Sequence, residues 1–254
     1  MKKFHSFIKE EFADLKILLR NIPSLTVAFF FLSVVCANLM ANKELFHVKY
    51  IALDCGFVFS WIMFLCMDVI CKRLGAKASI KVSSVALLVN LALCGIFALL
   101  SKSSGMWGEF YSTGNIQVNE ALNATFGGSW YVVLGSSLAF MVSSIINAFL
   151  NSFIGKIILR HSKSDGFFVF AARSYISTII GQFADNFIFA TIVSKIFFGW
   201  SWTQVFVCSL IGAFFELLAE VIFSGLGYRI VKNWENENVG QEYIEYRKRR
   251  KAEK

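Results

Sequence analysis

The chain has 254 residues, of which 56% are apolar and 17% charged, with a formal net charge of +8 and a mean hydropathy of +0.60. Soluble globular chains contain about 45–50% apolar residues, so this composition excludes an ordinary soluble domain. The apolar excess lies in long runs, and a helix needs about 20 mostly apolar residues to cross a bilayer. The sequence therefore predicts an all-α integral membrane protein.

Residues 1–23 are expected to form a short amphipathic helix on the membrane surface. Apolar residues such as Phe4, Ile8 and Phe12 recur at helical spacing, and Pro23 ends the pattern. The segment mixes charges and lacks an apolar stretch that leads to a cleavage site, so it does not resemble a signal peptide.

Six membrane-spanning helices in one bundle follow, and together they make a transmembrane domain of residues 24–231. The predicted spans are 24–42, 51–70, 79–100, 129–154, 167–193 and 203–230. The longest connection, residues 101–128, is polar and rich in Gly, and is expected to fold back as a lid or partial helix. Residues 232–254 are predicted to form a charged, solvated tail.

The basic residues predict how the chain lies in the cell membrane. Of the 25 Lys and Arg, 20 lie in the N-terminal segment, the second and fourth loops and the C-terminal end. The positive-inside rule then places both termini in the cytoplasm. The net positive charge is explained by this excess of Lys and Arg on the cytoplasmic side, where they contact anionic membrane lipids. No nucleic-acid partner is predicted.

Charged and amide side chains lie inside the predicted spans. A charge at the bilayer centre costs about 2.5–3.5 kcal/mol on insertion scales, so these residues are expected to face a cavity or a partner. The charged positions are Asp68, Arg173, Asp185, Glu216 and Glu220, with Asp54 near a span end. The amides are Asn38, Asn42, Asn90, Asn147, Asn151, Gln182 and Asn186.

Helical spacing places several of these residues on shared faces. The pairs four residues apart are Asn38 and Asn42, Asn147 and Asn151, and Glu216 and Glu220. Two carboxylates one turn apart repel unless one is protonated, paired or hydrated. If the polar faces converge, the bundle holds a polar pocket. Candidate aromatic walls are Trp61, Tyr175, Phe187 and Trp202.

Structural interpretations stay open for part of this set. The side chains of the Asn pairs are equally compatible with structural hydrogen bonds between helices. Asp68 and Arg173 can likewise be interfacial anchors or form an ion pair. The sequence has no GxSxG, HExxH, P-loop or dinucleotide motif. The six Cys lack CxxC spacing and the three His are scattered. We therefore predict no enzyme activity, metal or cofactor.

Three stretches resemble the motifs of a known family. Residues 37–43 (ANLMANK) match A-N-x-x-A-N-K, and residues 67–75 (MDVICKRLG) resemble D-x-x-x-E-x-x-G. Residues 173–189 (RSYISTIIGQFADNFIF) resemble R-x-x-x-S-T-x-x-G-Q-x-x-D, the most specific of the three. In this order, the motifs are similar to those of the queuosine precursor transporter family, also called the VUT family, over roughly residues 27–232.

The resemblance implies an importer of 7-deazaguanines such as preQ0, preQ1 or queuine, used to make or salvage queuosine in tRNA. The motif positions of this chain are Asn38, Asn42, Lys43, Asp68, Arg173, Ser177, Gln182 and Asp185. The chain departs from the pattern at Lys72, where the family has Glu. It also has Glu216 and Glu220 where many relatives carry a lysine and an apolar residue.

The chemistry of a deazaguanine suits these residues. A carboxylate can accept from both the ring N1–H and the 2-amino group, an amide can donate to O6, and the flat ring stacks on aromatic side chains at about 1–3 kcal/mol per base. The predicted substrate-binding residues are Asn38, Asn42, Gln182, Asp185, Glu216 and Glu220. The residues predicted for gating or polar structure are Lys43, Asp68, Asn147, Arg173, Ser177 and Asn186.

We expect transport by alternating access, with two inverted three-helix halves suggested by the repeated N-x-x-x-N spacing. Proton coupling through Glu220 or Asp185 and facilitated diffusion both stay open, as does a homo-oligomer. One alternative is a substrate-capture subunit of an ATP-driven vitamin-type uptake system that docks through Ala37 and Ala41. Others are a membrane protein for another nucleobase-like or vitamin substrate, and a membrane-embedded enzyme or a structural membrane protein.

Overall fold

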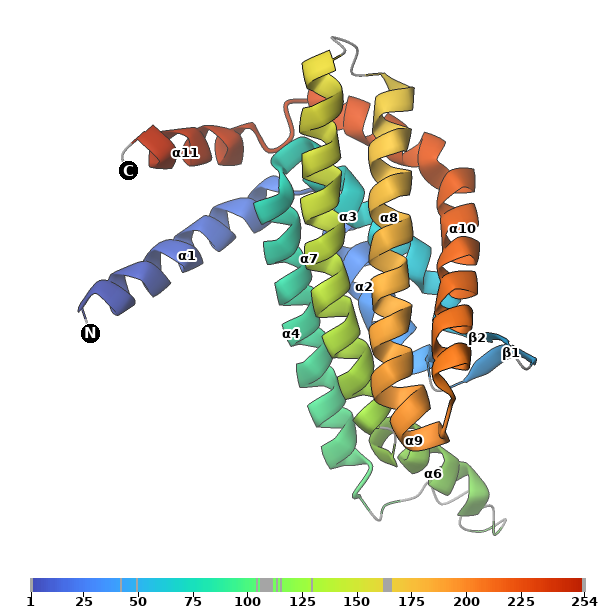
Figure 1. Ribbon diagram of the computed structural model, residues 1–254. Coiled ribbons are helices and arrows are strands. Elements are labelled where there is room, and N and C mark those ends of the chain that lie inside the picture. The colour runs from blue at the N-terminus through green and yellow to red at the C-terminus, as the bar shows by residue number, and fades with distance from the viewer. Residues whose placement is uncertain are drawn as a thin grey trace.

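A computed structural model describes residues 2–41, 43–48, 50–103, 105, 112, 114, 116–128, 130–161 and 166–252. The body of the fold is a bundle of long helices (Figure 1). They are α2 (Ser24–Met40), α3 (Phe57–Leu74), α4 (Ala76–Leu100), α7 (Trp130–His161), α8 (Phe167–Phe189) and α10 (Trp202–Asn236). Helix α7 packs along α8, and α10 packs against both α8 and α3. Apart from one short hairpin, which was not predicted, the regular structure of the described residues is helical, in agreement with the expected all-α class.

Length and composition support fewer spans than the sequence predicted. Within the described part of the chain, four helical stretches can each cross a membrane: residues 76–100, 116–158, 167–198 and 202–236. Helix α2, with 17 residues, qualifies only together with α1, from which it is bent by 108°. Helix α3 carries Asp68, Lys72 and Arg73 within its 18 residues. A helix stands at each of the six predicted spans, but the count of six and the inverted halves stay predictions.

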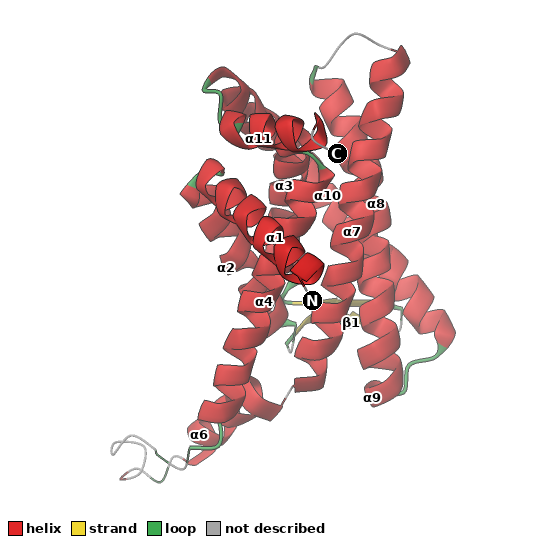
Figure 2. Cartoon of the chain, turned by 90° about the vertical axis from the view of Figure 1, so that its left-hand side faces the viewer, coloured by secondary structure: helices red, strands yellow, loops and turns green. Residues whose placement is uncertain are grey.

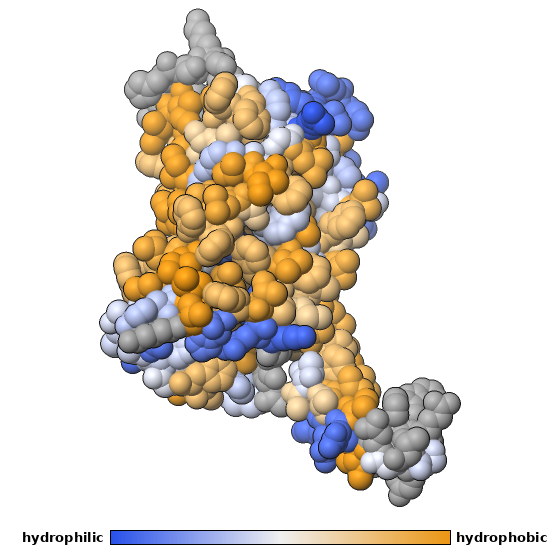
Figure 3. Space-filling model, turned by 90° about the vertical axis from the view of Figure 1, so that its right-hand side faces the viewer, coloured by the Kyte–Doolittle hydropathy of each residue, from blue (hydrophilic) through white to orange (hydrophobic). Residues whose placement is uncertain are grey.

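The outer surface of the bundle suits a membrane. Large apolar side chains such as Leu88, Phe149, Phe214 and Ile222 are exposed. In Figure 3, hydrophobic residues cover the middle of the bundle, and hydrophilic patches lie toward its two ends. An apolar surface of this extent marks a face that contacts lipid. The protein is thus a multi-pass membrane protein.

The predicted span 51–70 is wrong in its first part. Ile51–Asp54 form strand β2, which pairs antiparallel with β1 (Glu44–Val48), and α3 begins only at Phe57. Asp54 Oδ1 accepts a hydrogen bond of 2.7 Å from the Gly56 amide between the strand and the helix. The error has a physical cause, because a short apolar run is equally compatible with a buried strand and with a helix.

The connections at the hairpin end of the bundle are helical in part. The long loop contains α6 (Ile116–Asn123) and the π-helical turn η1 (Ala124–Gly128), in agreement with the expected partial helix. Helix α8 continues into a π-helical segment η2 (Ala190–Lys195) and the short α9 (Ile196–Phe198). Gly199 then ends this run with a φ of 72°, a left-handed conformation that favours glycine.

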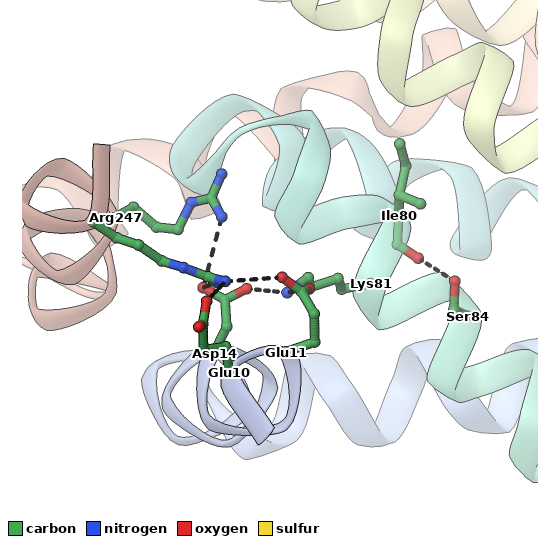
Figure 4. Close-up of polar contacts among 8 residues, drawn as sticks. Glu10, Glu11, Asp14, Ile80, Lys81, Ser84 and Arg247 are labelled. Atoms are coloured by element: carbon green, nitrogen blue, oxygen red, sulfur yellow. Dashed lines mark hydrogen bonds and ion pairs between the residues drawn. The ribbon is translucent and has the colours of Figure 1, made fainter. Parts of the chain in front are cut away.

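The two terminal helices lie together on the side of the bundle away from the hairpin, with α11 near one end and α1 sloping from there toward the middle (Figures 1 and 2). Helix α1 (Lys2–Asn21) contacts α11 (Gln241–Ala252) through an ionic cluster, drawn in Figure 4. Arg250 Nη2 lies 2.8 Å from Glu10 Oε2, and Arg247 Nη1 lies 3.7 Å from Asp14 Oδ1. Asp14 also pairs with Lys81 of α4, so the cluster ties both terminal helices to the bundle.

The C-terminal segment is not the solvated extension that the sequence predicted. Trp234 and Tyr243 are buried, and they belong to the same apolar core as Leu18 and Ile22 of α1. The prediction followed the many charged residues of this segment and gave no weight to Trp234 and Tyr243, the two aromatic residues that attach it to the bundle. Burial of the Tyr243 phenol raises its pKa to about 12.

The interior divides into an apolar and a polar part. The apolar core lies mainly between α1, α2, α3 and α4, around Phe30, Phe64 and Val82. Between α3, α7, α8 and α10 the buried side chains are largely polar, and they include Asp68, Asn147 and Glu220. The second part holds the candidate site.

Candidate functional site

A cavity of about 540 Å³ lies between the hairpin, the first turn of α7, the end of α8 with η2, and the first half of α10. Its polar lining residues are Lys43, Glu44, Asp54, Asn186, Ser194, Ser209 and Glu216. Its aromatic lining residues are Phe57, Tyr131, Phe189, Phe198 and Trp200. A volume within the range of about 300–1,000 Å³, apolar walls and a few polar groups are the features of a small-molecule site.

One carboxylate–amide pair forms part of the cavity wall. Asn186 Nδ2 on α8 donates a hydrogen bond of 3.0 Å to Glu216 Oε2 on α10, and Glu216 is 6% exposed. Gly212 makes this contact possible, because a Cβ at that position would lie 2.9 Å from Asn186 Nδ2. Ser60 of α3 lies beside the Glu216 carboxyl group, which keeps acceptor capacity for a ligand, as does the amide oxygen of Asn186.

The hairpin closes one side of the cavity and brings charge to it. The Cys55 amide donates a hydrogen bond of 2.8 Å to the Lys43 carbonyl, which joins the two ends of the hairpin. Lys43, Glu44 and Asp54 therefore reach the cavity from the same short segment. One cationic and three anionic side chains, counting Glu216, line the space among the described residues, so the site suits a ligand rich in hydrogen-bond donors.

A second polar cluster lies deeper, between α3, α7, α8 and α10. Asn147 Nδ2 donates a hydrogen bond of 2.9 Å to Asp68 Oδ1. Ser174 Oγ is in hydrogen-bonding contact with both Asp68 Oδ2 and Glu220 Oε1. Thr178 Oγ1 lies 3.5 Å from Asp68 Oδ2. Asp68, Ser174 and Glu220 are fully buried, so a carboxyl pair is sealed inside the bundle.

The expected ion pair between Arg173 and Asp68 is absent from the described residues. Arg173 instead donates from Nε to the Asn151 carbonyl at 3.1 Å and from Nη2 to Asn151 Oδ1 at 2.8 Å. Asn151 Nδ2 in turn donates to Ser177 Oγ at 3.4 Å. Asn147 and Asn151 both bond to another helix in this structure, one to Asp68 of α3 and the other to Arg173 of α8.

The other described substrate candidates lie outside the cavity wall: Asn38, Gln182 and Glu220 are buried, and Asp185 is partly buried. Gln182 is fully buried, and neither atom of its amide has a hydrogen-bond partner. Asp185 Oδ1 accepts a hydrogen bond of 2.7 Å from Ser143 of α7. Asn38 donates to the Val34 carbonyl at 2.7 Å, and its own Oδ1 has no partner. Asn42 lies outside the described residues.

The residues that line the cavity include only some of the predicted site residues, and several others that were not predicted. Of the six predicted substrate residues, Glu216 lines it, and so do Lys43 and Asn186 from the gating set. None of the four predicted aromatic walls lines it, and Trp61 stacks on Phe223 with centroids 4.0 Å apart. Sequence reasoning missed Tyr131 and Trp200, for which the one signal was an aromatic residue near a span end. It also missed Glu44, because the hairpin was not foreseen.

Comparison with known proteins agrees with the resemblance seen in the motifs. Residues 54–230 match a protein-family model whose description is "Putative vitamin uptake transporter". No curated protein and no solved structure matches the chain. The family match covers well over half of the chain and includes every element of the polar interior, and the protein belongs to the vitamin uptake transporter (VUT) family.

Proposed function

We propose that this transporter imports 7-deazaguanine precursors of queuosine and binds the base in the 540 Å³ cavity. The observation that carries this proposal is the Glu216–Asn186 pair set in an aromatic-lined cavity. Membership of the VUT family supports uptake, and the motifs at residues 37–43 and 173–189 support this substrate class.

The hydrogen-bonding groups of the cavity complement those of the base. Glu216 Oε1 can accept from the ring N1–H or the 2-amino group, which are neighbouring donors. The Lys43 side chain, from the hairpin, can donate to O6. Tyr131 and Trp200 offer flat surfaces on which the ring can stack. For preQ1 and queuine, which carry an amine, the Asp54 and Glu44 carboxylates give the cationic group a partner.

The position of the cavity suits import. It lies near the hairpin, toward the end of the bundle away from α1 and α11 (Figure 1). The distribution of Lys and Arg predicts that the end with α1 and α11 faces the cytoplasm. The cavity then receives substrate from outside, and the deeper polar cluster lies on the way inward.

The test is uptake of labelled preQ0, preQ1 and queuine by cells that cannot make the precursor. The intact chain is expected to restore uptake of at least one of them. Glu216→Gln should lower that uptake about 10- to 100-fold, because it weakens a charge-assisted hydrogen bond worth about 1.5–3 kcal/mol. Glu235→Gln is the matched control, since Glu235 lies on the same helix and bonds Lys232 at 2.7 Å, far from the cavity.

Two results would contradict the proposal. One is equal uptake by Glu216→Gln and the intact chain at equal membrane levels. The other is no uptake of any of the three compounds, with uptake of a different vitamin. Purified protein in liposomes separates a self-sufficient transporter from a capture subunit, which transports only with an added ATP-driven module.

A further inference from the structure

The buried pair Asp68 and Glu220 has one hydroxyl between its two carboxyl groups. Ser174 Oγ contacts Asp68 Oδ2 and Glu220 Oε1, and all three side chains are fully buried. A serine hydroxyl has one hydrogen to donate. It can donate to one of these carboxyl oxygens, and from the other it must accept. The second carboxyl group therefore has to hold a proton.

The charges around the pair support the same conclusion. Two ionised carboxylates buried together need cationic partners or protons. Among the described residues no ion pair reaches either carboxyl group, and Arg173 of α8 is engaged by Asn151. Helix α7 presents the neutral Asn147, and Cys71 of α3 donates from Sγ to the Ala148 carbonyl at 3.4 Å. Asp185 of α8 and Glu216 of α10 are also acidic, and the one cationic side chain among the described cavity residues, Lys43, comes from the hairpin together with Glu44 and Asp54.

A line of polar side chains leads from this pair to the cavity. On α8, residues Ser174, Thr178, Gln182 and Asn186 recur every four residues and wind gently along the helix toward the cavity. On the facing helix α10, Glu220 and Glu216 are also four residues apart. Contacts between the two helices occur at both ends of this line: Ser174 with Glu220, and Asn186 with Glu216.

Two fully buried groups along the line have unused hydrogen-bonding capacity. Both atoms of the Gln182 amide and Glu220 Oε2 have no partner. Unpaired buried polar atoms cost about 1–3 kcal/mol each, so they mark places where another species binds or passes. An amide can accept from one neighbour and donate to another, and Glu220 Oε2 can receive a proton.

We infer that Asp68, Ser174 and Glu220 form a proton-binding site, joined by the polar face between α8 and α10 to Glu216 in the cavity, that couples uptake to proton entry. With one shared proton the carboxyl pair carries a charge of −1. A second proton, arriving through Glu216, makes the pair neutral, and its release on the other side restores the first state. One proton crosses in each cycle and no other reactant is needed. The coupling rests on the proposed transport function, whereas the proton site itself does not.

The first experiment measures the proton without any substrate. Infrared titration of the purified protein should show a protonated carboxyl band that persists above neutral pH. Asp68→Asn and Glu220→Gln should each diminish that band, and Ser174→Ala should shift its position. Glu235→Gln, which changes a partly exposed ion pair on the same helix, should leave it unchanged. A wild-type spectrum with no such band, or a band that both carboxyl variants keep, overturns the inference.

The second experiment measures coupling with labelled preQ1 in liposomes. An inside-alkaline pH gradient should make the intact protein accumulate preQ1 several-fold above the outside concentration. Glu220→Gln should lose this accumulation but keep the exchange of internal for external preQ1, because exchange needs no net proton movement. Accumulation that ignores the pH gradient, or that follows a sodium gradient, contradicts the coupling. If preQ1 does not enter at all, the proposed substrate is wrong, and the infrared titration still decides the proton site.

Discussion

Asn186 on α8 and Glu216 on α10 meet in a hydrogen bond of 3.0 Å at the wall of the cavity. The two residues come from different helices, and none of the three motifs in the sequence pairs them. The contact depends on how closely α10 approaches α8, which makes the small residue at position 212 a sensitive test of the site.

Gly212→Ala is expected to impair substrate uptake while the protein still folds. Its Cβ would lie 2.9 Å from Asn186 Nδ2 and would displace the amide from Glu216. We expect uptake to fall about 10-fold, which corresponds to about 1.4 kcal/mol of lost binding. Gly225→Ala on the same helix is the control, because its Cβ meets nothing within 4 Å. Equal uptake by the two variants would show that the Asn186–Glu216 contact is not part of the site.

Gly155→Ala is expected to destabilise the bundle through Arg173. The new Cβ would lie 2.6 Å from Arg173 Cζ, and the guanidinium is held by Asn151 in a buried position. Overpacking of this kind costs about 1–3 kcal/mol, which should exceed the gain of about 1 kcal/mol from replacing a helical Gly with Ala. Thermal unfolding in detergent measures the change.

Gly95→Ala on α4 is the matched substitution for that experiment. It meets nothing within 4 Å, so it should leave the unfolding temperature unchanged or raise it. A Gly155→Ala protein as stable as Gly95→Ala would mean that the Arg173 side chain moves aside without cost.

Asp14→Asn is expected to loosen the attachment of the terminal helices. Asp14 is fully buried and pairs with Lys81, and Arg247 and Arg250 lie 3.7 and 3.9 Å from its Oδ1 (Figure 4). Its loss leaves these cations without a buried partner, so we expect about 2–3 kcal/mol of destabilisation. Glu245→Gln, which removes an exposed pair with Arg249, should cost at most about 1 kcal/mol. Limited proteolysis of α11 tests the same idea, because only Asp14→Asn should speed cleavage.

Acid is expected to weaken the contact between α1 and α4. The hydrogen bond from Lys81 holds the pKa of Glu11 below its ordinary value of 4.5. A carboxyl group with a lowered pKa stabilises the folded state fully above its unfolded pKa, and the effect disappears as the pH falls through the folded pKa. The difference in unfolding temperature between the intact protein and Glu11→Gln should therefore be present at pH 7 and be lost as the pH falls through the folded pKa of Glu11, which lies below 4.5. A difference that stays constant over this range would exclude an ionic role for Glu11.

Much of the fold could be predicted because membrane helices are encoded locally. Long apolar runs gave a helix at each of the six predicted positions, and Pro23 gave the break between α1 and α2. The hairpin at Glu44–Asp54 could not be predicted, since its apolar residues are also compatible with a helix. The attachment of the C-terminal segment was missed because Trp234 and Tyr243 are two aromatic residues within a charged stretch.

The sequence by itself determined that this is a helical membrane protein of the VUT family with carboxylates and amides inside its helices, because hydrophobicity, helical spacing and motifs are local properties of the chain. Only the tertiary structure decided which of those polar groups meet. It placed Glu216 and Asn186 at the cavity, joined Asp68 to Glu220 through Ser174, and turned Arg173 toward Asn151. Partners on different helices depend on the rotation and approach of whole helices, and those follow from the packing of the entire bundle.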